Sequence, residues 1–222
     1  MLRSEERYNA IMTEIIRVDA TAPDMGALKK AAMLLRQGEV VAIPTDTVYG
    51  LAANPFDAKA VEKVFALKGR AEMAPLLLLV DSVEMAAALG KNLPQKFFRL
   101  AQQFWPGPLT MVVEASQEIP SKVTAGTGTI GLRWPAAAIP VGLVRESGFA
   151  VTGTSANLTG KPACIAAEEV AREFGERLQM ILDGGPSRDR MASTVLRIFD
   201  DTFEMVREGA VSREKIELAI RG

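Results

Sequence analysis

The sequence predicts an α/β fold with a mixed sheet, and three observations lead to that prediction. Short apolar runs typical of buried strands alternate along the chain with stretches whose apolar residues recur at helical spacing. Several of the helical stretches begin at a residue that caps helices well, and two of them end at a glycine. Some neighbouring strands lack room for a crossover helix, so antiparallel pairs are expected beside parallel ones.

The first half of the chain alternates strands with capped helices. Asp24 and Asp57 each precede a stretch with apolar residues at helical spacing, and Gly38 and Gly69 follow these stretches. An aspartate at the start and a glycine past the end are typical of helix caps, so two helices are expected there. The apolar runs around them predict strands at 15–18, 40–43 and 76–80.

The second half continues the same alternation. Ser82, Pro94 and Ser212 each open a helical pattern, and further helices are expected at 141–146 and 166–174. The remaining apolar runs predict strands at 109–113, 130–133, 149–152, 180–182, 194–198 and 203–206.

Composition limits the compartment and the partners. The 222 residues suit one large domain, expected to span 1–222 with its core at about 12–215 after a short polar lead. The net charge of −1 does not by itself indicate nucleic acid or an anionic membrane as a partner. A single cysteine, Cys164, excludes an intramolecular disulfide, and the apolar run at 74–80 is too short for a bilayer. We therefore expect a cytoplasmic protein without membrane contact.

The absence of histidine narrows the chemistry. The chain contains none, which excludes a Ser-His-Asp triad, a Cys-His pair and an H-E-x-x-H zinc site. An enzyme with this composition must use lysine, arginine, carboxylates, hydroxyls and backbone amides, with or without a bound metal.

The stretch "IPTDTVYGL", residues 43–51, places hydroxyl groups directly after a predicted strand. Pro44 cannot donate to a sheet ladder, so the strand is expected to end there. Thr45 and Thr47 point the same way if the segment is extended, and Gly50 allows the backbone to turn. Spacing alone favours a strand-to-helix loop whose hydroxyls satisfy their own backbone.

Two pairs of polar residues have spacings that suit phosphate oxygens. Lys68 and Arg70 flank Gly69, although cations are also favoured near any helix C-terminus by the helix dipole. Ser155 and Asn157 follow a predicted strand and could point into one pocket, or form an ordinary Ser/Asn-rich turn. Neither pair is specific alone.

The remaining polar loops also lie at strand boundaries. The string "GTGTIG" at 126–131 runs into a predicted strand rather than a helix, which excludes a dinucleotide-binding motif. Thr129 and, farther on, Arg133 remain as candidate ligand-binding residues of this stretch. Ser193 and Arg207 lie at two other strand boundaries. In open α/β sheets, strand ends are where ligands bind, so several such loops together favour a binding site.

Taken together, these stretches resemble the YrdC/Sua5 family of threonylcarbamoyl-AMP synthases. The matching strings occur in the family's order over about residues 25–215: "PTDTVYGL", "KGR", "FWPGPLT", "GTIGLRWP", "TSANLTG", "DGG" and "STV", with a looser match at "VREGAVS". No single string is specific, but the set is. Since the chain ends soon afterwards, it resembles the short form of the family, without the additional Sua5 domain.

The resemblance implies a twisted, mostly open α/β sheet with flanking helices around a concave basic cavity. It implies that L-threonine, bicarbonate and ATP give L-threonylcarbamoyl-AMP and pyrophosphate. The product feeds the N6-threonylcarbamoyl modification of adenosine at position 37 of tRNA, so tRNA and a threonylcarbamoyl-transferase complex are the implied downstream partners. Mg²⁺ is expected to bridge the ATP phosphates with few protein ligands.

The resemblance also assigns residues. The K-x-R and S-x-N elements imply a catalytic, phosphate-binding set: Lys68, Arg70, Ser155 and Asn157. Further positions near the nucleotide are Thr129, Ser193 and Arg207. Threonine is expected to contact Thr45 and Arg133, with Thr47 and Tyr49 shaping the same pocket. No protein metal ligand is assigned.

Some positions depart from the family pattern and keep two alternatives open. Asp81 and Ala137 stand near places where the family often has histidine, and "AEMAPLLLL" after Arg70 is less polar than usual. One alternative is a paralogue that carbamoylates or adenylates another acceptor. The other is a double-stranded RNA- or tRNA-binding module without catalysis.

Overall fold

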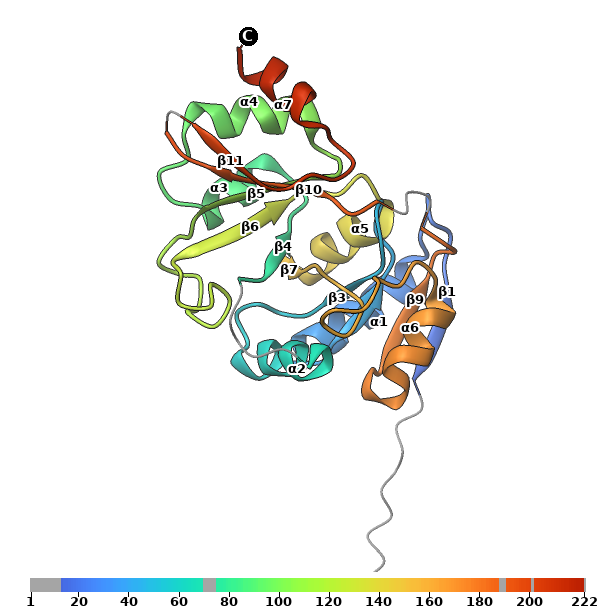
Figure 1. Ribbon diagram of the computed structural model, residues 1–222. Coiled ribbons are helices and arrows are strands. Elements are labelled where there is room, and N and C mark those ends of the chain that lie inside the picture. The colour runs from blue at the N-terminus through green and yellow to red at the C-terminus, as the bar shows by residue number, and fades with distance from the viewer. Residues whose placement is uncertain (1–12, 70–74, 188–190, 201, 222) are drawn as a thin grey trace, which may run out of the picture.

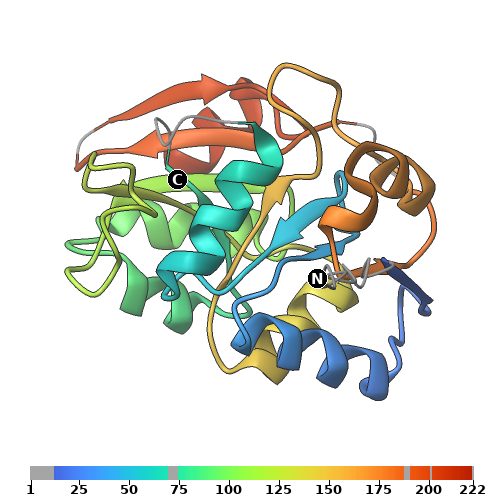
Figure 2. The same cartoon turned by 90° about the horizontal axis from the view of Figure 1, so that it is seen from below.

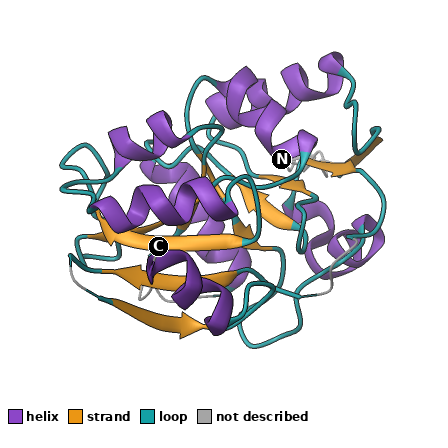
Figure 3. Ribbon diagram, turned by 90° about the horizontal axis from the view of Figure 1, so that it is seen from above, coloured by secondary structure: helices purple, strands orange, loops and turns teal. Residues whose placement is uncertain are grey.

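The computed structural model describes residues 13–69, 75–187, 191–200 and 202–221. In this part of the chain, eleven strands form two mixed sheets and seven α-helices flank them. Figure 1 shows the two sheets side by side, and Figure 3 shows helices on both sides of the strands. The α/β class with mixed pairing is confirmed, but the strands divide between two sheets rather than one.

The predicted helices are all present. Asp24 caps the first through a hydrogen bond from Ala27 N, Asp57 caps the second, and Ser82 caps the third through Met85 N. No helix in the described part of the chain is long and apolar enough to cross a membrane. The bounds are α1 Met25–Arg36, α2 Ala58–Lys68, α3 Val83–Leu89, α4 Gln95–Phe104, α5 Ala138–Ser147, α6 Ala167–Phe174 and α7 Arg213–Arg221.

The smaller sheet has the strand order β1-β9-β2-β3-β8. β9 pairs in parallel with β1 and β2, whereas β3 pairs antiparallel with β2 and β8. α1 and α5 lie side by side (Figure 2), and their apolar faces share one core cluster with β2 and β9. Its strands are β1 Glu14–Arg17, β2 Val41–Ile43, β3 Gly50–Ala52, β8 Thr154–Ser155 and β9 Met180–Asp183.

The larger sheet has the order β11-β10-β5-β6-β4-β7. β10 and β5 are parallel, as are β6 and β4, and the other neighbours are antiparallel. α4 and α7 contact each other beside this sheet (Figure 1). Its strands are β4 Leu77–Leu79, β5 Leu109–Glu114, β6 Thr129–Arg133, β7 Val151–Thr152, β10 Thr194–Ile198 and β11 Phe203–Arg207.

The chain passes from one sheet to the other at Gly153. β7 ends at Thr152 in the larger sheet and β8 begins at Thr154 in the smaller one. Gly153 N donates to Leu77 O, and Thr152 N donates to Ala53 O. This crossing brings the loops at the edges of both sheets together.

Gly153→Ala is expected to lower the free energy of unfolding by about 1–3 kcal/mol, the usual cost of overpacking a core. A Cβ atom at this position would lie 2.5 Å from Cγ of Leu79, which is fully buried. Urea denaturation measures the change. Gly50→Ala is the control, because its Cβ would meet its nearest neighbour at 3.5 Å. Equal stability of the two variants would contradict the close approach at Gly153.

Candidate active site

A cavity of about 660 Å³ lies where loops from the two sheets meet. All of the described residues that the sequence singled out for the site line it, whereas Arg70 falls outside the described residues. The lining contains five cations in all, three of them among the predicted residues, and no Asp or Glu among the described residues. The predicted residues that line it are Thr45, Thr47, Tyr49, Lys68, Thr129, Arg133, Ser155, Asn157, Ser193 and Arg207.

The loop at 44–49 connects two antiparallel strands, because β2 pairs with β3 from Ile43 opposite Gly50. The prediction that this loop leads from a strand into a helix is therefore wrong. Gly50 is the first residue of a strand, β3, rather than part of a turn. The expected hydrogen bonds between a hydroxyl of this loop and the backbone of the same loop are present at Thr45. Oγ1 of Thr45 donates to Val48 O at 2.7 Å and accepts from the backbone N of Thr47 at 3.1 Å. This bonding holds the loop in a compact turn.

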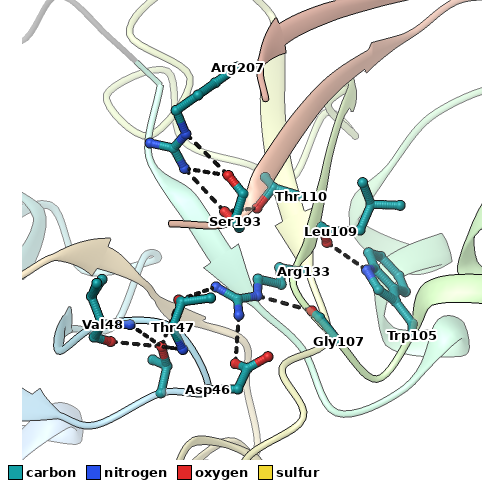
Figure 4. Close-up of polar contacts among 11 residues, drawn as sticks. Asp46, Thr47, Val48, Trp105, Gly107, Leu109, Thr110, Arg133, Ser193 and Arg207 are labelled. Carbon is teal, nitrogen blue, oxygen red and sulfur yellow. Dashed lines mark hydrogen bonds and ion pairs between the residues drawn. The ribbon is translucent and has the colours of Figure 1, made fainter. Parts of the chain in front are cut away.

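Arg133 ends β6 as a buried residue with 3% exposure. Its guanidinium donates in three directions, as Figure 4 shows: Nε to Gly107 O at 3.1 Å, Nη1 to Thr47 Oγ1 at 2.9 Å and Nη2 to Asp46 Oδ1 at 2.6 Å. These three hydrogen bonds hold the plane of the guanidinium in one orientation. A guanidinium with a fixed plane is well suited to bind a planar carboxylate ligand.

Lys68, the last residue of α2, is 4% exposed and holds the turn that follows β8. Its Nζ donates to Ser155 O at 2.6 Å, to Asn157 O at 3.2 Å and to Asn157 Oδ1 at 3.4 Å. Ser155 Oγ in turn donates to Asn157 Oδ1 at 2.5 Å. The K-x-R lysine and the S-x-N pair therefore form one connected group on one wall of the cavity.

Arg207, at the end of β11, lies on another wall. It donates to Ser193 O through Nε at 3.1 Å and Nη2 at 2.8 Å, and Ser193 Oγ lies 2.9 Å from Thr110 Oγ1 (Figure 4). Burial, together with repulsion from the Arg133 guanidinium, lowers the pKa of Arg207 from its ordinary value. Two guanidinium groups thus influence each other across the cavity, an arrangement that favours an anionic ligand between them.

Tyr49 links the loop at 44–49 to its neighbours. Its hydroxyl donates to Gly185 O at 2.8 Å, and burial together with Asp183 raises the pKa of the phenol. Its backbone N donates to Cys164 O, and Ala156 N donates to Tyr49 O. Tyr49 therefore joins the "PTDTVYG" loop to the S-x-N turn, while its hydroxyl is held by the turn after β9.

Cys164 is expected to react with a thiol reagent at pH 8 on the order of 100-fold more slowly in the folded protein than in urea. Burial, with Glu169 and Glu173, raises the pKa of the Cys164 thiol to about 11, so little thiolate forms. The folded thiol keeps its proton after the unfolded one loses it, so this shift lowers stability between about pH 8.5 and 11. Ellman's reagent measures the rates, and equal rates would contradict the buried position.

Sequence reasoning missed several contributors. Asp46 and Gly107 hold Arg133, and Thr110 contacts Ser193. Lys161 and Arg197 add cations to the lining. The contacts of Asp46, Gly107 and Thr110 join residues that are 87, 26 and 83 positions apart, so local spacing gave no signal for them.

The chain matches a known family and several named relatives. The family model Sua5_yciO_yrdC, described as "Telomere recombination", matches residues 33–209. A Bacillus subtilis protein called threonylcarbamoyl-AMP synthase is 40% identical over 87% of this chain and 56% of its own length. One of the same name from Halorhodospira halophila is 35% identical over 77% of this chain and 93% of its own length.

A solved structure gives the same result for the fold. The crystal structure of Pyrococcus abyssi Sua5 complexed with L-threonine has a TM-score of 0.90 and 38% identity over 94% of this chain. The chain spans 61% of that protein and 56% of the B. subtilis relative. The extent of the family match and the identity to these relatives show that the chain belongs to the Sua5/YciO/YrdC family.

Proposed function

We propose that this protein is a threonylcarbamoyl-AMP synthase, which converts L-threonine, bicarbonate and ATP into L-threonylcarbamoyl-AMP and pyrophosphate. The observation that carries the proposal is the convergence of three groups on one cavity. These are Arg133 with Thr45 and Thr47, Lys68 with Ser155 and Asn157, and Arg207 with Ser193. The names of the relatives and the threonine complex of P. abyssi Sua5 support the same assignment.

The substrates divide naturally between the walls. Arg133, fixed against Asp46 and Thr47, suits the threonine carboxylate. Arg207 forms no ion pair among the residues that the structure describes, so it suits the more highly charged phosphates. The turn of Ser155 and Asn157, which Lys68 holds, would face the nucleotide, and Thr129 belongs to the same cavity lining. We place Arg70 on this nucleotide side as well.

The reaction requires no protein nucleophile. The threonine nitrogen attacks the carbon of CO₂ or bicarbonate to form a carbamate, and bicarbonate releases water in this step. A carbamate oxygen then attacks the α-phosphorus, and pyrophosphate leaves. Holding the reactants in line and neutralising phosphate charge can supply the catalysis. A cavity of hydroxyls, amides and cations without histidine is adequate for these tasks.

ATP would bring Mg²⁺ bound to its own phosphates. Among the residues that the structure describes, no group of three or more His, Cys, Asp or Glu side chains is arranged to hold a metal ion. Mg²⁺ prefers hard oxygen ligands such as carboxylates, and the described cavity lining contains none. The described residues therefore do not fit a magnesium ion held by the protein itself.

Pyrophosphate release tests the proposal when each substrate is omitted in turn. Release is expected only with threonine, bicarbonate and ATP together. Turnover that is indifferent to threonine would favour a carbamoyl or adenylyl transfer to another acceptor. Tight, salt-sensitive RNA binding without any ATP turnover would favour an RNA-binding module.

The wider role follows from the product. A threonylcarbamoyl adenylate is an activated intermediate, so the acceptor tRNA and the complex that transfers the group are the downstream partners we propose. Because these are found with ATP in the cytoplasm, we place the protein there.

We also propose that residues 1–222 form a single YrdC-like domain, with a core at about 12–215. The chain crosses between the sheets at Gly153, and both sheets contribute to one cavity.

A further inference from the structure

We propose that Asp46 is a positioning residue, which holds the Arg133 guanidinium in the orientation that binds the substrate carboxylate. This inference rests on the proposed function, because it assumes that Arg133 contacts threonine. Asp46 stands inside the "PTDTVYG" loop, and neither the resemblance nor the spacing of the sequence assigned it a role.

The geometry places Asp46 behind Arg133 as seen from the cavity. Asp46 Oδ1 lies 2.6 Å from Arg133 Nη2, yet Asp46 is not part of the cavity lining, whereas Arg133 is. Figure 4 shows Arg133 between Arg207 on one side and Asp46 on the other. The carboxylate therefore acts on the substrate through Arg133 rather than by direct contact.

The donors of Arg133 can be counted. A guanidinium has five N–H groups. The protein uses one each for Gly107 O, Thr47 Oγ1 and Asp46 Oδ1. Two remain, which is the number that a carboxylate accepts in a bidentate contact. Removing the Asp46 contact would release the guanidinium on one side and change which N–H groups face the cavity.

Hydrogen-bond direction reinforces this arrangement. Arg133 can only donate, so Thr47 Oγ1 accepts from it and has its own proton left for Thr45 Oγ1, 3.1 Å away. Thr45 Oγ1 donates its own hydrogen bond to Val48 O at 2.7 Å. The hydrogen bonds thus run from Arg133 through Thr47 and Thr45 to the carbonyl of Val48. They fix the loop that carries Asp46 relative to the guanidinium.

The carboxylate of Asp46 is not expected to contribute much to the stability of the fold. Oδ2 of Asp46 is enclosed and has no hydrogen-bond partner among the described residues. A buried ion pair with an unsatisfied oxygen is often no more stable than an apolar pair of similar size. Its benefit is orientation and charge: Asp46 places a carboxylate against Arg133, the guanidinium whose charge helps to lower the pKa of Arg207.

The test compares Asp46→Asn with Asp81→Asn. Asp81 forms an aspartate–arginine ion pair with Arg145, and neither residue lines the cavity. Calorimetry on the full chain measures the binding of L-threonine, of L-threonine amide, which has no carboxylate, and of ATP. Asp46→Asn is expected to weaken threonine binding at least about tenfold and ATP binding less than about twofold. Its preference for threonine over the amide should fall in parallel, whereas Asp81→Asn should keep all three values.

Asp46→Glu retains the charge and is expected to recover most of the threonine preference. If Asp46→Asn does not fold, Asp46→Ser takes its place. The expected result is the same: weaker threonine binding with little change in ATP binding. Unchanged threonine preference in a folded Asn or Ser variant would overturn the proposal, as would equal losses for threonine and its amide. If neither variant folds, Asp46 is a structural residue and the proposal fails. A wild-type protein that binds no threonine would instead contradict the proposed function itself, and this inference with it.

Discussion

Lys68→Met is expected to reduce threonine-dependent pyrophosphate release by on the order of 100-fold or more, because misplacement of catalytic groups by about 1 Å has effects of that size. The Lys68 ammonium donates to both the Ser155 and Asn157 carbonyls, so its loss frees the S-x-N turn. Methionine keeps the length of the side chain without the charge. Steady-state kinetics with saturating substrates measures the effect.

The same variant is expected to be less stable by about 1–3 kcal/mol, because buried carbonyl oxygens lose a donor. Lys63→Met is the matched control: Lys63 lies on the same helix, α2, but pairs with Glu39 at the surface. Its rate and stability should remain close to those of the wild type. A well-folded Lys68→Met protein with the wild-type rate would show that the S-x-N turn does not depend on this ammonium.

Arg133→Lys is expected to weaken the use of threonine by on the order of 100-fold, since a point charge cannot reproduce the planar fork of a guanidinium. The lysine retains a positive charge beside Asp46, so the buried carboxylate keeps a counter-ion and the fold should persist. The effect should appear in the KM for threonine more than in that for ATP.

Circular dichroism and thermal melting establish that Arg133→Lys is folded before its kinetics are interpreted. Arg145→Lys provides the comparison, because Arg145 also pairs with an aspartate but is exposed and outside the cavity lining. Equal increases in the KM values for threonine and ATP would place Arg133 at a shared position and not in the threonine site.

Most of the fold was predictable because its signals are local. Asp24, Asp57 and Ser82 cap the helices that the sequence predicted, and β10 spans Thr194–Ile198 as expected. Two strands were missed: β3 has three residues and β8 has two, too few for any periodic pattern. Without them, the division into two sheets could not be foreseen.

The residues that line the cavity could be predicted from the sequence, but their contacts could not. The described candidate residues do line one cavity, yet local spacing gave no indication that Asp46 and Thr47 meet Arg133, which lies 87 and 86 residues farther along the chain. Lys68 lines the cavity, and local spacing gave no indication that its Nζ donates to the turn at Ser155 and Asn157. Such roles depend on tertiary packing and on hydrogen-bond direction, neither of which a motif records.

The measurement that tests the central claim most directly uses ¹³C-labelled bicarbonate with L-threonine, ATP and the purified protein, followed by mass spectrometry. If the cavity joins these three substrates, the label appears in one new species with the mass of threonylcarbamoyl-AMP, in an amount equal to the pyrophosphate released. An adenylate that forms without threonine, or pyrophosphate release without the label in any adenylate, would contradict this account.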